Sequence, residues 1–170
     1  RLVLKHWDHG VEQWIVRLNR LCAWCPELAL PAIGEEDRRH LLEQICHGAV
    51  SQKDIKDRPV RPVVEAWLSA AQKELLEQHA PERLRLSNGR TPRLTYAAEG
   101  EPFVALRIQE LFGVTTTPRI AQGRVPVLFH ILAPNMRPVQ ITQDLAGFWR
   151  EHYPRAKQEL QRRYPKHEWR

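Results

Sequence analysis

The chain has 170 residues, 42% hydrophobic and 27% charged, which suits a domain of about 100 to 200 residues and excludes collagen-like, low-complexity and fully disordered chains. Its net charge of +6 arises in the second half: residues 1–80 hold 11 Lys and Arg against 12 Asp and Glu, whereas residues 81–170 hold 15 against eight. No apolar run reaches the roughly 18 residues of a membrane span, and residues 1–10 resemble no signal peptide or transit sequence. We therefore expect a soluble, cytoplasmic protein with no membrane partner.

Helical periodicity dominates the first 80 residues. Apolar side chains recur at steps of three and four, the spacing of one face of a helix. Pro26 marks the end of the first such run, and Gly48 lies just past the second. The predicted elements are a helix over 11–25, a helix over 35–47, a loop over 51–57 and a helix over 62–80. These elements predict a helical subdomain over residues 1–80.

From Leu84 onward the apolar period changes to two, which is typical of β-strands. Asn88 and Gly89 separate two short alternating runs, and an Asn-Gly pair in this position predicts a β-hairpin. The predicted strands lie over residues 84–86, 94–96, 103–108, 125–132 and 139–142. Together they predict a small, mainly antiparallel sheet of four or five strands.

The last part of the chain predicts helix again. Thr142 is suited to cap a helix that continues to about Tyr164, with a kink or a new start at Pro154. The predicted fold class is therefore α+β, with a helical N-terminal half, the small sheet and C-terminal helices. Residues 81–170 form the second predicted subdomain, and we expect the two subdomains to make one compact unit.

Two residue counts bear on the origin of the chain. The only Met is Met136, so the chain lacks an initiator, and we interpret it as a segment of a longer protein. Three Cys is an odd number, which argues against the paired disulfide framework of a small secreted protein.

Cys22 and Cys25 form a C-x-x-C pair, a spacing found in metal and redox sites. A structural zinc site needs four ligands, and only the adjacent Cys46 and His47 lie near in the sequence. The pair also falls at a predicted helix end, where the helix dipole disfavours a thiolate. We therefore favour packing in the core, with a zinc site that includes Cys46 as the alternative.

The sequence contains none of the common catalytic or nucleotide-binding motifs. H-E-x-x-H, G-x-S-x-G, the phosphate-binding loop G-x-x-x-x-G-K-[ST] and G-x-G-x-x-G are all missing. His130 lies in a predicted strand, where a histidine is more often structural than catalytic. We predict no catalytic, cofactor-binding or metal residue on this chain, which by itself is not expected to be an enzyme.

The basic second half points to a polyanionic partner. Of the 26 basic residues 20 are Arg, whose planar guanidinium suits phosphate oxygens and stacks on bases. The candidate nucleic-acid-binding residues are Arg119, Arg124, Arg150, Arg155, Lys157, Arg162, Arg163, Tyr164 and Lys166. A solvated basic face is the alternative, and for the nearby Trp149 and Tyr153 we favour packing of the helix on the sheet.

Several strings, in the same order, resemble the C-terminal region of the HrpB-type ATP-dependent helicases, the bacterial branch of the DEAH/RHA group. They are Leu106–Gly113 (LRIQELFG), Thr117–Ala121 (TPRIA), Gly123–Leu128 (GRVPVL), Arg137–Trp149 (RPVQITQDLAGFW) and Arg163–His167 (RYPKH). The resemblance is dense from about Ala80 to the last residue and looser before it.

The resemblance implies that the parent is a superfamily 2 helicase that hydrolyses ATP, with Mg²⁺, on two RecA-like domains that this chain does not contain. No catalytic residue carries over. The implied role is an accessory C-terminal domain of an RNA helicase, whose partners are the upstream helicase domains of the same chain and single-stranded RNA or DNA. The alternative is a protein-interaction module or structural scaffold without nucleic-acid binding.

Overall fold

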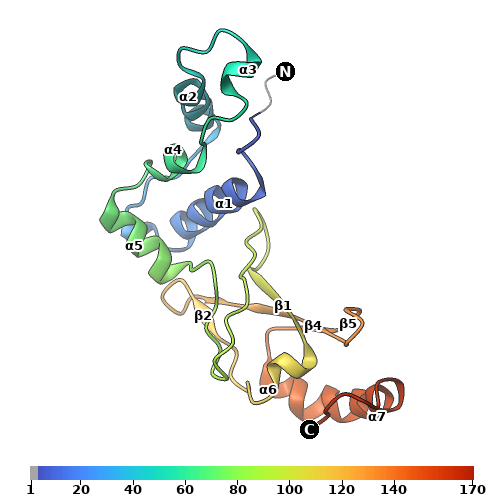
Figure 1. Cartoon of the computed structure of the whole chain (residues 1–170). Helices are drawn as coiled ribbons and strands as arrows, with labels where there is room; N and C mark the ends of the chain where they lie inside the picture. Colours follow the sequence, from blue (N-terminus) through green and yellow to red (C-terminus); the bar gives the residue numbers. More distant parts are fainter. Residues whose placement is uncertain (1–3) are drawn as a thin grey trace. The chain divides into compact units, whose positions relative to one another are not determined.

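The computed structural model describes residues 4–170, apart from the side chains of Gln52 and Ile55. Contacts divide the chain into an N-terminal unit, which ends at Ala80, and a C-terminal unit, which begins at Pro81. The first unit is helical, and the second holds a small sheet and a C-terminal helix (Figure 1). The predicted α+β class is thus confirmed.

Across residues 4–170, no helix combines the length and the hydrophobicity needed to cross a membrane. That the two units form one compact body stays a prediction.

The N-terminal unit is built from short helices joined by tight turns. They are α1 (His9–Trp24), the 3-10 turn η1 (Pro26–Leu28), α2 (Glu35–Cys46), α3 (Gln52–Ile55), α4 (Arg61–Glu65) and α5 (Ala70–His79). The predicted helices over 11–25 and 35–47 correspond to α1 and α2. α1 begins where the Asp8 carboxylate accepts a hydrogen bond of 3.1 Å from the backbone N–H of Val11, which satisfies one of the unpaired donors of the first turn.

Two predictions for this unit need correction. The predicted loop over 51–57 contains the single helical turn α3, because the Asp54 carboxylate accepts hydrogen bonds from the backbone N–H groups of Val50 and Ser51. The predicted helix over 62–80 is two helices. Ser69 starts the second one, since its hydroxyl accepts from the N–H of Gln72 while the Gln72 side chain accepts from the N–H of Ser69, a capping box that begins a helix.

The core of the N-terminal unit lies along α1, where Ile15, Leu18 and Leu21 are fully buried. Arg17 is buried among them, and its Nη2 donates to Glu77 Oε1 of α5 at 2.6 Å. This ion pair links α1 to α5. Loss of Glu77 would leave the buried guanidinium of Arg17 without its carboxylate partner, and an unpaired buried charge is costly.

The C-terminal unit contains a three-stranded sheet and a separate two-stranded ribbon. The sheet has the order β1-β4-β5, and the ribbon pairs β2 with β3 in the antiparallel sense. The strands are β1 (Phe103–Arg107), β2 (Arg119–Ile120), β3 (Val125–Pro126), β4 (Leu128–Leu132) and β5 (Pro138–Thr142). The predicted strand over 125–132 is therefore divided at Val127 between the ribbon and the sheet.

The sheet is mixed, which corrects the expected strand arrangement of four or five largely antiparallel strands. β1 and β4 are parallel, with Phe103 opposite Leu128 and Arg107 opposite Leu132, whereas β4 and β5 are antiparallel. Residues 108–127, which include the 3-10 turn η2 (Ile108–Leu111), carry the chain back to the start of β4. A crossover of this length is what a parallel pair requires.

The predicted hairpin at Asn88 and Gly89 forms its turn without continuous strands. The N–H of Leu86 donates to the carbonyl of Arg90 at 2.9 Å, and Gly89 adopts a φ of +86° that glycine tolerates. Beyond the turn the two arms are joined by an isolated bridge between Arg83 and Arg93, with a hydrogen bond of 2.9 Å from Leu84 N–H to the Pro92 carbonyl.

One continuous helical segment ends the C-terminal unit: α6 (Leu145–Gly147), the π-helical turn η3 (Phe148–His152) and α7 (Tyr153–Arg163). The cap is Asp144 rather than the predicted Thr142, since Asp144 Oδ1 accepts from the N–H of Gly147 at 2.9 Å. Thr142 instead accepts from the N–H of Asp144. The wider π turn lies directly before Pro154, which has no N–H to continue an α-helical pattern.

Gly147 and its capping residue Asp144 give a first test of this segment. A Cβ on Gly147 would overlap Asp144 Oδ2, so alanine must displace the capping carboxylate. We expect Gly147→Ala to destabilise the chain, although alanine favours helices over glycine by about 1 kcal/mol. In an Asp144→Ala background the same change should stabilise by about 1 kcal/mol. Urea unfolding of the unaltered chain, the two single variants and the double variant measures this coupling between Gly147 and Asp144. Equal effects of Gly147→Ala in both backgrounds would contradict it.

The ion pair between Glu12 and Arg38 predicts a pH dependence in the N-terminal unit. Arg38 donates two hydrogen bonds, 2.9 and 3.0 Å, to the Glu12 carboxylate, and this pairing holds the pKa of Glu12 below its ordinary value. A lowered folded pKa contributes stability above the unfolded pKa of about 4.3, and this contribution is lost as the pH falls through the folded value.

Glu12→Gln should therefore lower the free energy of unfolding at pH 7 by about 0.2–1 kcal/mol, the range for a half-exposed pair. The loss should shrink as the pH falls below the unfolded pKa and through the lowered folded pKa of Glu12. Urea unfolding over a series of pH values from 7 downward measures the difference. In an Arg38→Gln background the effect of Glu12→Gln should become smaller, with a remainder from the hydrogen bond that the Trp7 indole donates to the Glu12 carboxylate. An unchanged pH dependence there would refute the assignment.

Candidate nucleic-acid interface

The structure places the nine predicted binding residues in two regions of the C-terminal unit. Arg119 lies on β2, and Arg124 lies in the turn between β2 and β3. The other seven belong to the C-terminal helical segment and to the residues after it: Arg150 in η3, then Arg155, Lys157, Arg162 and Arg163 in α7, then Tyr164 and Lys166. All nine are exposed or half-buried, so each side chain is accessible to a ligand.

Several of these basic groups already have partners. Arg119 Nε donates to the carbonyl of Gly123 at 2.7 Å, Arg150 pairs with Glu151 at 3.2 Å, and Arg162 pairs with Glu159.

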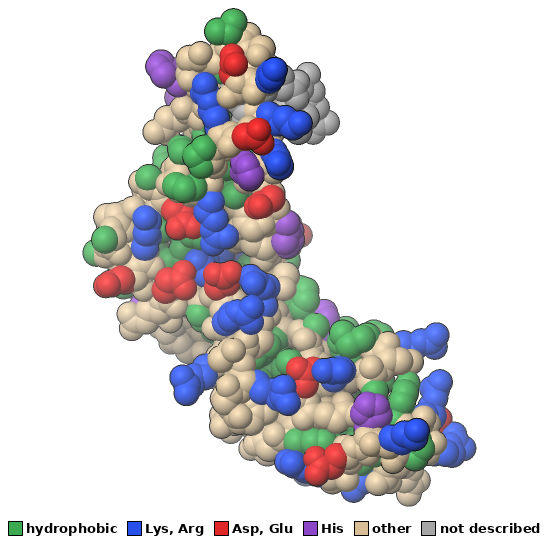
Figure 2. Space-filling view, in the orientation of Figure 1, with side chains coloured by type: hydrophobic (Ala, Val, Ile, Leu, Met, Phe, Trp, Pro, Cys, Tyr) green, Lys and Arg blue, Asp and Glu red, His purple; other side chains and the backbone are tan. Residues whose placement is uncertain are grey.

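The remaining four basic candidates, in α7 and after it, have no acidic partner among the described residues. Within residues 4–170, no carboxylate forms an ion pair with Arg155, Lys157, Arg163 or Lys166. On the face shown in Figure 2, Lys and Arg side chains dominate the C-terminal unit, whereas the N-terminal unit shows both signs of charge. The charge difference between the two halves of the sequence therefore appears on the surface, where it can attract an anion.

Helical periodicity separates the basic residues of α7. Tyr153, Ala156 and Leu160 form the inward-facing stripe, with Tyr153 and Leu160 buried, and the same spacing of three and four reaches Arg163. Arg155 and Arg162 each follow a stripe residue by two positions, which is about 200° around the helix, and both are exposed. The two adjacent arginines 162 and 163 thus point in different directions.

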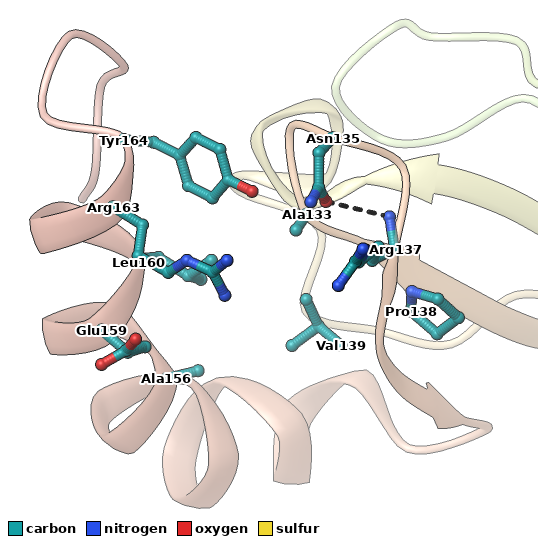
Figure 3. A pocket seen from close by; sticks show the side chains of 10 residues that line it. All are labelled: Ala133, Asn135, Arg137, Pro138, Val139, Ala156, Glu159, Leu160, Arg163 and Tyr164. Carbon is teal, nitrogen blue, oxygen red and sulfur yellow. Dashed lines mark hydrogen bonds between the residues drawn. The ribbon is translucent and has the colours of Figure 1, made fainter.

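A pocket of about 260 Å³ lies between α7 and the turn that joins β4 to β5 (Figure 3). Its apolar wall comes from Ala133, Pro138, Val139, Ala156 and Leu160. Its polar side chains are Asn135, Arg137, Glu159, Arg163 and Tyr164. Two of the predicted residues, Arg163 and Tyr164, therefore meet in one pocket.

Arg137 is a residue of this pocket that sequence reasoning missed. It sits in the β4–β5 turn, where Met136 has a φ of +71° and the Asn135 side chain accepts from the N–H of Arg137 at 3.1 Å. The available signal was the Asn135-Met136-Arg137-Pro138 turn itself. The sequence does not reveal that this turn faces α7.

The aromatic residues of the helical segment are mostly structural. Trp149 packs edge-on against Phe148 and Tyr153, with ring centroids 5.0 and 4.9 Å apart, and its indole N–H donates to the carbonyl of Val114 at 2.7 Å. Burial raises the pKa of the Tyr153 hydroxyl. Tyr153 is buried and Trp149 half-buried, so the favoured packing role is confirmed, although both rings contact Phe112 and Phe148, which lie outside the strands. Of the candidate residues, Tyr164 is the aromatic one at the pocket.

The C-x-x-C pair also packs as predicted. Cys25 is buried in the N-terminal unit, and the Cys22 thiol donates to the carbonyl of Leu30 at 3.3 Å. Burial raises the pKa of Cys22, which disfavours the thiolate that a metal site needs. The part of the chain that the structure describes contains no group of three or more metal-ligating side chains.

His130 has a structural role. Its ring in β4 stacks on the ring of Phe103 in β1, with the two centroids 4.3 Å apart.

Comparison with known proteins identifies the family. The family model for the ATP-dependent helicase C-terminal region, HrpB_C, matches residues 41–170. The ATP-dependent RNA helicase HrpB of Escherichia coli (strain K12) is 35% identical, over 99% of this chain and 21% of that protein.

Two crystal structures match the fold. One is of the E. coli DExH-box NTPase HrpB, with a TM-score of 0.87 at 33% identity over 97% of this chain and 21% of that one. The other, of the E. coli DEAH/RHA helicase HrpB, has a TM-score of 0.76 at 32% identity over 98% of this chain and 22% of that one. This chain thus spans about a fifth of these relatives. Since the family model also covers most of its residues, the chain belongs to the HrpB family of ATP-dependent helicase C-terminal domains.

Proposed function

We propose that this chain is the accessory C-terminal domain of a bacterial, cytoplasmic ATP-dependent RNA helicase, and that its C-terminal unit binds single-stranded nucleic acid. The domain contacts the helicase core of its own protein, and ATP and Mg²⁺ are handled by that core. The observation that carries the proposal is the family match, which covers residues 41–170 and relates this chain to a fifth of an RNA helicase.

Charge supports the nucleic-acid part of the proposal. Arg155, Lys157, Arg163 and Lys166 lie close together in the sequence at the end of the chain and have no acidic partner among the described residues. Binding of such groups to phosphates releases the counterions condensed on the strand, which favours association at low salt. A helicase acts on strands that it separates, so a single strand is the form of nucleic acid that an accessory domain meets.

A structural scaffold without nucleic-acid binding is the second candidate function. One observation favours it: the strings 106–113 and 137–149, which carry part of the family resemblance, supply buried core residues such as Ile108, Leu111 and Phe148. Their resemblance then reflects the demands of packing. The two candidates differ in one property, affinity for nucleic acid, and this property can be measured directly.

The test is fluorescence anisotropy of the 170-residue chain with labelled single-stranded RNA, titrated from low to physiological salt. We expect binding whose logarithm falls with log[salt] by about 0.7 for each phosphate contact. The triple variant Arg155→Gln, Lys157→Gln, Lys166→Gln removes three unpaired charges and should make this slope shallower by about 2. Unchanged anisotropy at low salt would leave the scaffold as the function.

The matched control is a triple variant of the N-terminal unit, Lys53→Gln, Lys56→Gln, Lys73→Gln. It changes the net charge by the same amount on a unit that carries no basic excess. We expect it to leave the salt slope unchanged. Equal effects of the two triple variants would show that RNA responds only to net charge, and the proposed surface on the C-terminal unit would be wrong.

A further inference from the structure

We propose that the pocket between α7 and the β4–β5 turn binds one nucleotide of a single strand. The base enters the apolar part of the pocket, and the guanidinium groups of Arg137 and Arg163 bind the neighbouring phosphates. This inference rests on the proposed function and names the site within the C-terminal unit at which a strand is held.

The first argument is the charge of the pocket. Figure 3 shows the guanidinium groups of Arg137, from the β4–β5 turn, and Arg163, from α7, extending toward each other across it. In the described chain neither forms an ion pair with a carboxylate, and the one acidic residue of the lining, Glu159, pairs with Arg162. Two like charges that face each other repel, and an anion between them replaces this repulsion by attraction.

The second argument is the apolar wall beneath these charges. Val139, Ala156 and Leu160 present only carbon to the pocket, so it is not a site for a free inorganic anion alone. Its volume of about 260 Å³ lies below the roughly 300–1,000 Å³ of pockets for drug-sized ligands, which suits one ring system. A nucleotide combines this flat apolar group with a phosphate on each side.

The third argument is the placement of the two arginines by the backbone. Arg163 is exposed and follows the stripe of Ala156 and Leu160 along α7. The backbone of Arg137, also exposed, is fixed in a turn closed by hydrogen bonds of 2.8 Å, from Ala133 N–H to the Arg137 carbonyl and from Met136 N–H to the Ala133 carbonyl. Tyr164 adds a half-buried aromatic ring at the rim. A base can stack on a phenol ring or on a guanidinium plane. Only an unstacked base can enter, so the site selects single strands over duplex.

The test compares neighbouring arginines of α7. Arg163→Gln should weaken binding of labelled oligouridylate about tenfold. Arg162→Gln removes the same charge one residue earlier and should weaken it by about twofold at most, because that guanidinium does not line the pocket and already pairs with Glu159. Arg137→Gln should match Arg163→Gln. Its control is Arg93→Gln in the same unit, an exposed arginine outside the pocket whose guanidinium pairs with Glu82 at 2.7 Å.

A second variant tests whether a base enters the pocket, without a change of charge. In Ala156→Leu the larger side chain fills the pocket from α7. It should weaken binding of oligouridylate and leave binding of an abasic strand of equal length unchanged, since the abasic strand offers only phosphates. Thermal unfolding of each variant, with a melting temperature equal to that of the unaltered chain, shows that the fold is retained.

The outcomes separate the two proposals. If the unaltered chain binds RNA but Arg163→Gln and Arg162→Gln weaken it equally, the pocket is not the site and the proposed function stands. If Ala156→Leu binds both strands as the unaltered chain does, the base does not enter. If the unaltered chain binds no strand at low salt, both proposals fail.

Discussion

The C-terminal unit depends on the parallel pairing of β1 with β4. This pairing puts β4 at the centre of the sheet, with β1 and β5 on its two sides, and it buries Val104, Leu106, Phe129 and Ile131 on one face. Because parallel neighbours cannot be joined by a tight turn, residues 108–127 must leave the sheet and return. The β2–β3 ribbon and the aromatic contacts of Phe112 result from this detour.

The same arrangement creates the pocket. β4 ends in a tight turn, so β5 returns beside it and Arg137 is held at the tip of the pair. The helical segment, capped by Asp144, then runs back along the unit, and α7 presents Leu160 and Arg163 to that turn. Arginines from two elements thus face one apolar cavity without a carboxylate partner among the described residues, which distinguishes them from Arg150 and Arg162, whose guanidinium groups pair with Glu151 and Glu159.

Local patterns predicted much of the fold and only part of the site. α1 and α2 were predictable because their apolar spacing and end residues agree. The division of the predicted helix over 62–80 into two helices was not predictable, since its apolar pattern continues past Ser69, where the capping box starts a new helix. The sheet was expected to be mainly antiparallel, and β1 is parallel to β4. In β1 buried Val104 and Leu106 alternate with exposed Ala105 and Arg107, a pattern typical of antiparallel strands. Here a parallel pair is buried mainly on one face, so periodicity does not reveal strand direction.

The sequence by itself determined the α+β class, the basic excess of the second half, the packing role of Trp149 and the family resemblance. These features depend on composition, on near neighbours in the chain or on the order of short strings. The tertiary structure decided the direction of β1 and β4, which of the basic side chains are paired, and the meeting of Arg137 with Arg163. Such features depend on contacts between residues far apart in the sequence, and no local pattern encodes which surfaces will face each other.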